Sequence, residues 1–173
     1  MDPFATLGVE ARFDLAPSDL ERRHRELSRA VHPDRHAAGP TSLRRVALSR
    51  AIELNEAYRL LKDPIRRAQK LLELRGVSVA EGQEPKPSGA LLMEMMEARE
   101  ALSEAGHAKD LAAVERLATQ MRAREAALLE RLTEALDSSD DAGNGRALSL
   151  LGELRYTRRF LDEVAAFEEM LLA

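Results

Sequence analysis

The near absence of β-branched and aromatic side chains is the feature that most limits the folds open to this chain. Its 173 residues include only seven valines, two isoleucines and six aromatics, whereas alanine and leucine supply 28 residues each. Strands favour β-branched and aromatic side chains, and helices favour Ala and Leu. The chain is 45% hydrophobic and 32% charged, which is typical of a globular protein rather than a disordered or membrane-embedded one. We therefore predict an all-α fold.

Cysteine is absent from the chain. This excludes a disulfide framework, a thiolate zinc site, a cysteine nucleophile and an iron–sulfur cluster held by the chain's own thiolates. No run approaches the ~18 apolar residues of a membrane span. The first residues also lack the basic and apolar regions of a signal peptide. We expect a cytoplasmic protein that makes no membrane contact.

A stretch rich in glycine and proline, residues 76–89, divides the chain. It predicts a first domain over 1–76, a linker over 77–88 and a second domain over 89–173. Residues 1–75 carry 15 Lys and Arg against 11 Asp and Glu, and residues 76–173 carry 11 against 19. The two parts therefore have net charges of +4 and −8, which suggests two surfaces with different partners. The acidic total argues against nucleic acid as the main ligand.

Capping residues, prolines and apolar periodicity predict four helices before the linker and three after it. The first is expected to run from Pro3 to near Gly8, and the second from Pro17 to a stop at Val31-His32-Pro33. The third follows Pro40 and ends at Asp63-Pro64, which caps a fourth over 65–75. The others are expected over about 89–105, 108–137 and 146–172, with a polar turn at 138–145. Short connections between the last three predict an antiparallel three-helix bundle.

The tripeptide His32-Pro33-Asp34 follows the second helix, in a loop between two helices of opposite direction. Proline fixes the backbone there and presents an imidazole and a carboxylate rigidly. The preceding helix carries Arg22, Arg25 and Arg29 on a face away from its apolar stripe, and Arg35 extends the positive surface. Such a surface suits docking on an acidic partner, although a basic helical face is more often solvated surface alone.

Two other interpretations of these residues are weaker. His24, His32 and His36 raise the question of a metal site, but His24 falls on the apolar stripe, as a core histidine would, and no fourth ligand is evident. His32 with Asp34 raises acid–base catalysis, but no further group completes a catalytic set. We predict no metal, no cofactor and no enzymatic activity.

The helix expected from Gly89 carries two apolar stripes, which is more than one core face needs. One stripe, with Leu91 and Met95, is the expected inner face. The other, Leu92, Met93 and Met96, falls on the side that should face water, flanked by Glu97 and Glu100. Methionine-rich apolar surface rimmed by acids is typical of an adaptable protein-binding patch. Burial against the first domain is the alternative.

The final helix has a similar pattern. Its expected inner face consists of Leu150, Leu154, Leu161, Ala165 and Leu172. Tyr156 is expected to point nearly opposite this face. Such a position would place the tyrosine ring on the outside of the bundle, between two arginines.

The first domain resembles the J-domain of DnaJ-type co-chaperones, in its basic helix, its His-Pro-Asp loop and the later Leu-Asn-Glu-Ala-Tyr-Arg-Leu-Leu-Lys-Asp-Pro. The segment Leu-Leu-Met-Glu-Met-Met-Glu-Ala-Arg-Glu-Ala-Leu resembles the carboxy-terminal domain of the HscB family, co-chaperones of iron–sulfur cluster biogenesis. The resemblance covers almost the whole chain. It implies a J-domain, formed by an antiparallel helical hairpin with short helices, and a three-helix domain in an L-shaped arrangement.

The resemblance also implies two partners, the chaperone ATPase HscA and the scaffold protein IscU. The chaperone-binding residues would be Arg22, Arg25, Arg29, His32, Pro33, Asp34 and Arg35. The scaffold-binding residues would be Leu92, Met93, Met96, Glu97, Glu100 and Tyr156. Two alternatives stay open: a J-domain co-chaperone with another client, and a helical nucleic-acid-binding protein that uses the arginine-rich second helix.

Overall fold

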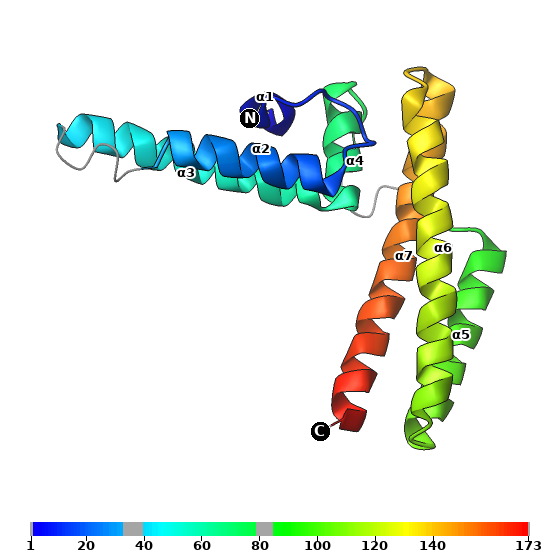
Figure 1. The fold of residues 1–173 in the computed structure, drawn as a ribbon. Helices are drawn as coiled ribbons and strands as arrows, with labels where there is room; N and C mark the ends of the chain where they lie inside the picture. The colour runs from blue at the N-terminus through cyan, green and yellow to red at the C-terminus, as the bar shows by residue number, and fades with distance from the viewer. Residues whose placement is uncertain (1, 33–39, 79–84, 173) are drawn as a thin grey trace. The chain divides into compact units, whose positions relative to one another are not determined.

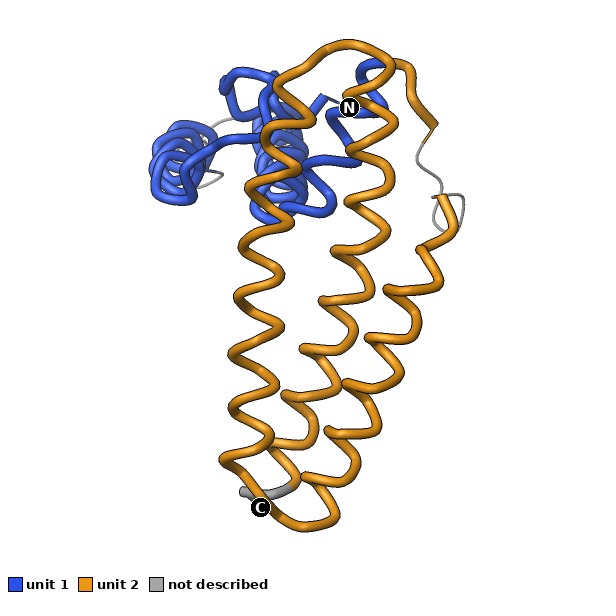
Figure 2. Tube along the Cα trace, turned by 90° about the vertical axis from the view of Figure 1, so that its right-hand side faces the viewer, with its two compact units in different colours: residues 1–75 blue, residues 76–173 orange. Residues whose placement is uncertain are grey.

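The computed structural model describes residues 2–32, 40–78 and 85–172. The chain falls into two compact units, Met1–Arg75 and Gly76–Ala173 (Figure 2). All the regular elements in the described residues are helices, which confirms the all-α prediction. Residues 79–84 of the predicted linker lie outside the described residues, and the L-shaped arrangement stays a prediction.

Four helices form the first unit: α1 (Pro3–Leu7), α2 (Pro17–Ala30), α3 (Thr41–Lys62) and α4 (Pro64–Leu74). The helices α2 and α3 lie side by side as an antiparallel hairpin (Figure 1). Their ends follow the predicted signals. The Asp63 carboxylate accepts hydrogen bonds from the backbone N–H groups of Ile65 and Arg66 at 2.8 and 3.1 Å. Pro64 occupies the first turn of α4, where a backbone N–H would have no partner within the helix, so the missing N–H of proline costs nothing.

A buried arginine, which the sequence analysis did not single out, holds the first unit together. Arg67 of α4 is 7% exposed, and its guanidinium donates hydrogen bonds to three backbone carbonyls, those of Leu61, Phe13 and Leu15, at 2.7, 2.7 and 3.2 Å. Burial lowers the pKa of the Arg67 guanidinium. These bonds fasten the segment between α1 and α2 to the corner where α3 meets α4. One signal was available: Arg67 lies four residues before the buried Leu71, on the apolar side of α4.

The second unit is a bundle of three helices, α5 (Gly89–His107), α6 (Leu111–Asp137) and α7 (Asp141–Leu172). The helices α5 and α7 run in the same direction and α6 runs against both, as predicted (Figures 1 and 2). One core cluster combines residues of all three helices: Leu91, Met95, Leu102, Ala105, Val114, Ala118, Met121, Phe160 and Val164.

Gly106 was expected to end a helix and Gly143 to lie in a polar turn, but both lie inside helices. A Cβ atom at Gly106 would lie 2.4 Å from Cε1 of Phe167, so the glycine lets α7 approach α5, and α5 continues to His107. A Cβ atom at Gly143 would lie 2.7 Å from the carbonyl oxygen of Ala135. The predicted turn over 138–145 is therefore wrong in its second half, since α7 already begins at Asp141. Both glycines serve close packing rather than a turn.

The predicted inner face of α7 is correct at its start and wrong further along. Leu150 and Leu154 are buried, whereas Leu161 is half-buried and Ala165 is exposed. Phe160 and Val164 occupy the core instead. The buried positions recur on average every 3.5 residues along this long helix, as they do where helices pack side by side over many turns. The predicted positions are spaced more widely, so the later ones fall outside the buried face. The side chain of Leu172 lies outside the described residues.

Candidate functional site

The first candidate surface is the arginine face of α2, formed by Arg22, Arg25 and Arg29. All three side chains are exposed, as predicted. The opposite side of α2 packs on α3, and its residue Leu20 is 1% exposed. The helix thus directs its guanidinium groups outward because its apolar stripe is used for packing.

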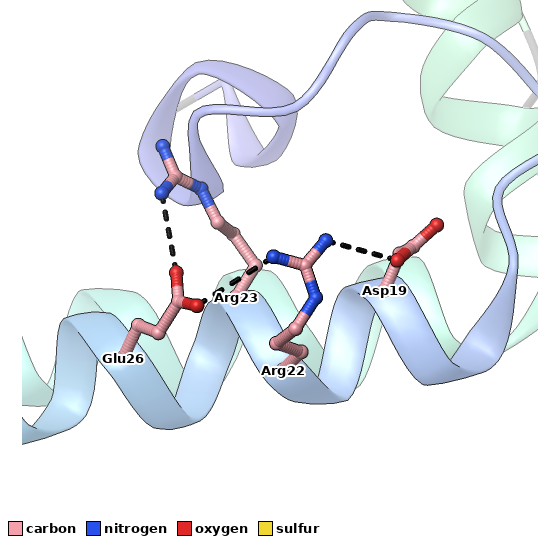
Figure 3. A network of polar contacts seen from close by, with 4 residues as sticks. All are labelled: Asp19, Arg22, Arg23 and Glu26. Atoms are coloured by element: carbon pink, nitrogen blue, oxygen red, sulfur yellow. Dashed lines mark hydrogen bonds and ion pairs between the residues drawn. The ribbon is translucent and has the colours of Figure 1, made fainter.

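Carboxylates on the same helix pair with these arginines. The Arg22 guanidinium lies 3.0 Å from Asp19 and 3.5 Å from Glu26, which also contacts Arg23 at 3.4 Å (Figure 3). The pKa of Arg22 is raised, first by its hydrogen bond to Asp19. Because α2 carries four arginines and three carboxylates, its charges largely balance. The surface is therefore less cationic than predicted, and it offers an ordered pattern of alternating charges.

The predicted loop lies directly after this face. The helix α2 ends at Ala30, and His32 is exposed two residues later. Pro33, Asp34 and Arg35 lie outside the described residues. His32 thus follows Arg29 by three residues, at one end of the hairpin. The roles assigned to Pro33, Asp34 and Arg35 stay predictions.

The weaker metal interpretation finds no support at His24. Its ring stacks on Tyr58, with 4.3 Å between the ring centroids, and its Nε2 atom lies 2.9 Å from Oδ1 of Asn55. This half-buried pair joins α2 to α3, so His24 packs between the two helices without being fully buried in the core. Within residues 2–32, 40–78 and 85–172, no group of three His, Cys, Asp or Glu residues is placed to hold a metal ion. His36 lies outside those ranges.

The second candidate surface is the apolar patch of α5, formed by Leu92, Met93 and Met96. These side chains are 41, 66 and 69% exposed, although their neighbours Leu91 and Met95 are only 4 and 2% exposed. The predicted division of α5 into an inner and an outer apolar stripe is confirmed. A helix that buries one stripe completely and leaves another open has more apolar surface than its own core uses.

Acidic side chains border the apolar patch. Glu97 and Glu100 are exposed, and neither makes an ion pair with another described residue. Glu94, one turn earlier, is different because it binds Arg124 of α6. The patch therefore combines soft apolar surface with two carboxylates that are available to a basic partner.

Tyr156 is placed differently from the prediction. Its ring is half-buried and packs against the core cluster rather than pointing opposite the inner face. It lies close enough to Arg99 to favour the charged guanidinium, whose pKa is raised mainly by hydrogen bonds to Glu163. The prediction failed because it used the wrong inner face for α7. The ring still belongs to the α5 side of α7, so part of it remains accessible beside α5.

The Arg99–Glu163 pair was not predicted. The Arg99 Nε and Nη2 atoms both donate to the Glu163 carboxylate, at 2.8 to 3.1 Å, and this joins α5 to α7. The sequence gives no signal for this pair, because which residues of two helices meet depends on how the whole bundle packs.

Membrane insertion has no structural basis in the part of the chain that the structure describes. None of its helices combines the length and apolar character that crossing a bilayer requires.

Comparisons with known proteins agree with one another. A family model described as the HSCB C-terminal oligomerisation domain matches residues 88–165. A co-chaperone protein HscB homolog of Pseudoalteromonas atlantica is 36% identical over 172 residues, with 99% of this chain and 98% of that protein covered. An HscB homolog of Burkholderia multivorans is also 36% identical, over 168 residues, with 97% and 94% covered.

Two solved structures have the same fold. Chaperone HscB from Vibrio cholerae superposes with a TM-score of 0.83 at 31% identity, and 99% of each chain is covered. Human co-chaperone protein HscB gives a TM-score of 0.86 at 23% identity, with 97% of this chain and 82% of the human chain covered, which shows the shared fold.

Proposed function

Because the chain belongs to the HscB family of co-chaperones, which are not enzymes, we propose that it stimulates the ATPase of the DnaK-type chaperone HscA and delivers the scaffold protein IscU to it. This activity assists iron–sulfur cluster assembly and transfer. The first unit contacts the chaperone through the arginine face and the loop from His32 to Arg35. The second unit holds the scaffold.

The apolar patch of α5 is the observation that carries this proposal. Three large apolar side chains on a well-packed helix stay 41 to 69% exposed, and they are bordered by Glu97 and Glu100, which pair with no other described residue. Covering them with a partner would remove apolar surface from water at about 25 cal/mol per Å². A co-chaperone needs such a second surface, because a J-domain without client contact cannot bring a client and a chaperone together at high effective concentration.

Binding of the scaffold tests the patch directly. We expect the double variant Leu92→Ala/Met96→Ala to bind purified IscU-type scaffold at least about tenfold more weakly by calorimetry, because two exposed anchors are lost. The matched control is Leu111→Ala, an apolar side chain of the same unit that is 43% exposed outside the patch. Unchanged scaffold affinity in the double variant would overturn the assignment of the patch.

A J-domain co-chaperone with another client is the second candidate. ATP turnover by HscA separates the two: in the proposed function, the chain and the scaffold added together raise turnover more than the sum of each alone. Stimulation by the chain with no further effect of the scaffold would favour another client.

A further inference from the structure

The apolar patch is continuous with a seam between α5 and α7. On α5, Leu92 and Met96 lie within about 20° and 60° of Arg99 around the helix axis, given about 100° per residue. On α7, Tyr156, Glu163 and Met170 follow one another at intervals of seven residues, so they share a face. Since Arg99 binds Glu163, these two faces meet.

The register along this seam is fixed by two contacts. Arg99 binds Glu163, and one heptad further along α5 Gly106 lies so near the Phe167 ring that an added Cβ atom would be 2.4 Å from it. The helices α5 and α7 run in the same direction (Figure 1). The seam therefore leads from the apolar patch, past the Arg99–Glu163 pair, to the last turns of α7.

An apolar pocket lies at the far end of the seam. It measures about 260 Å³ and is lined by Glu163, Ala166, Phe167 and Met170. Met170 is 60% exposed and Ala166 is also exposed, so the pocket opens to solvent. Its size is below the about 300–1,000 Å³ of small-molecule sites and suits a single side chain of a protein partner.

The charge around the pocket indicates what kind of side chain this is. Residues 160–172 contain no lysine or arginine but four carboxylates, Asp162, Glu163, Glu168 and Glu169. Glu168 and Glu169 make no ion pair with any other described residue. An apolar side chain next to a lysine or arginine would suit both the pocket and the acidic last turns of α7.

The last turns of α7 are therefore acidic, and one of their carboxylates, Glu163, lines the pocket itself. On this basis, and resting on the proposed function, we propose that the scaffold-binding surface extends from the apolar patch along the seam to this pocket. The pocket takes one apolar side chain of the scaffold, and the carboxylates in the last turns of α7 attract a neighbouring lysine or arginine of the scaffold. The Arg99–Glu163 pair lies between the two apolar regions and keeps α5 and α7 in register beneath the bound segment.

Two substitutions at exposed positions test the pocket without disturbing the core. Ala166→Trp fills the pocket with a side chain of the chain itself, and Met170→Lys replaces a pocket wall with a charge that repels a basic partner segment. We expect each variant to bind purified IscU-type scaffold about tenfold more weakly by calorimetry. Leu111→Lys is the matched control, since it changes an exposed apolar residue that does not line the pocket, and we expect its affinity to stay within about twofold. Melting temperatures measured by circular dichroism show that each variant is folded.

The outcomes separate this inference from the proposed function. If both pocket variants bind the scaffold like the unmodified chain while Leu92→Ala/Met96→Ala binds weakly, the extension is wrong and the proposed function stands. If the patch variant also binds normally, the proposed function fails as well. If Ala166→Trp instead changes the monomer–dimer equilibrium in sedimentation and leaves scaffold affinity unchanged, a second copy occupies the pocket and the inference is overturned.

Discussion

At the scale of single residues, Arg67 shows how one buried charge can fix the path of a segment. Its guanidinium has three carbonyl partners from two parts of the first unit and lies 5.5 Å from the centroid of the Phe13 ring. Binding three carbonyls at once needs several donors in a fixed planar arrangement, and only arginine supplies them.

We expect Arg67→Ala to lower the free energy of unfolding of the first unit by about 2–4 kcal/mol, because it leaves buried carbonyls without donors. Arg67→Lys should also destabilise the unit, since one ammonium cannot reach all three carbonyls. Urea unfolding followed by circular dichroism measures both, with the exposed Arg66→Ala as the control. Equal stability of the Arg66 and Arg67 variants would contradict this role.

The glycines at the start of α7 offer a second test at this scale. A Cβ atom at Gly143 would lie 2.7 Å from a backbone oxygen, whereas nothing lies within 4 Å of a Cβ atom at Gly145. Gly143→Ala should therefore destabilise the second unit by about 1–3 kcal/mol. Gly145→Ala should be neutral or stabilise it by up to about 1 kcal/mol, since alanine favours a helix. Thermal unfolding of the two variants provides the comparison, and the reverse order would show that the close approach at Gly143 is not real.

At the scale of helices, the sequence predicted a helix boundary best where a residue at that boundary sets it. Pro17, Pro64 and the Asp63 cap begin helices where expected, because these residues act on their own backbone. Gly106 was misjudged as a helix end because its role depends on Phe167, which is 61 residues away in the sequence. The two stripes of α5 were predictable from periodicity. The place of Tyr156 was not, because it depends on how α7 packs.

The close approach of α5 and α7 also makes a prediction for this pair of helices. Gly106→Ala should destabilise the second unit by about 1–3 kcal/mol, even though alanine is the better helix former, because its methyl group meets the Phe167 ring. A smaller side chain at 167, in Phe167→Leu, should reduce that cost. A double-mutant cycle by urea unfolding measures the coupling, and additive effects of the two substitutions would contradict direct contact.

At the scale of the whole molecule, the two compact units have opposite charge and separate candidate surfaces. Composition was enough to predict an all-α chain, and the sequence motifs were enough to predict a family. The balance of charge on α2 required the structure, because a row of arginines does not show which carboxylates pair with them.

The central claim is that the first unit activates the chaperone and the second unit holds the scaffold. The most direct measurement is ATP turnover by HscA with the scaffold present, compared for the unmodified chain, His32→Gln and Leu92→Ala/Met96→Ala. We expect His32→Gln to abolish stimulation while scaffold binding stays intact. The patch variant should keep the stimulation seen without scaffold and lose the added effect of the scaffold. Full stimulation by His32→Gln would contradict the account.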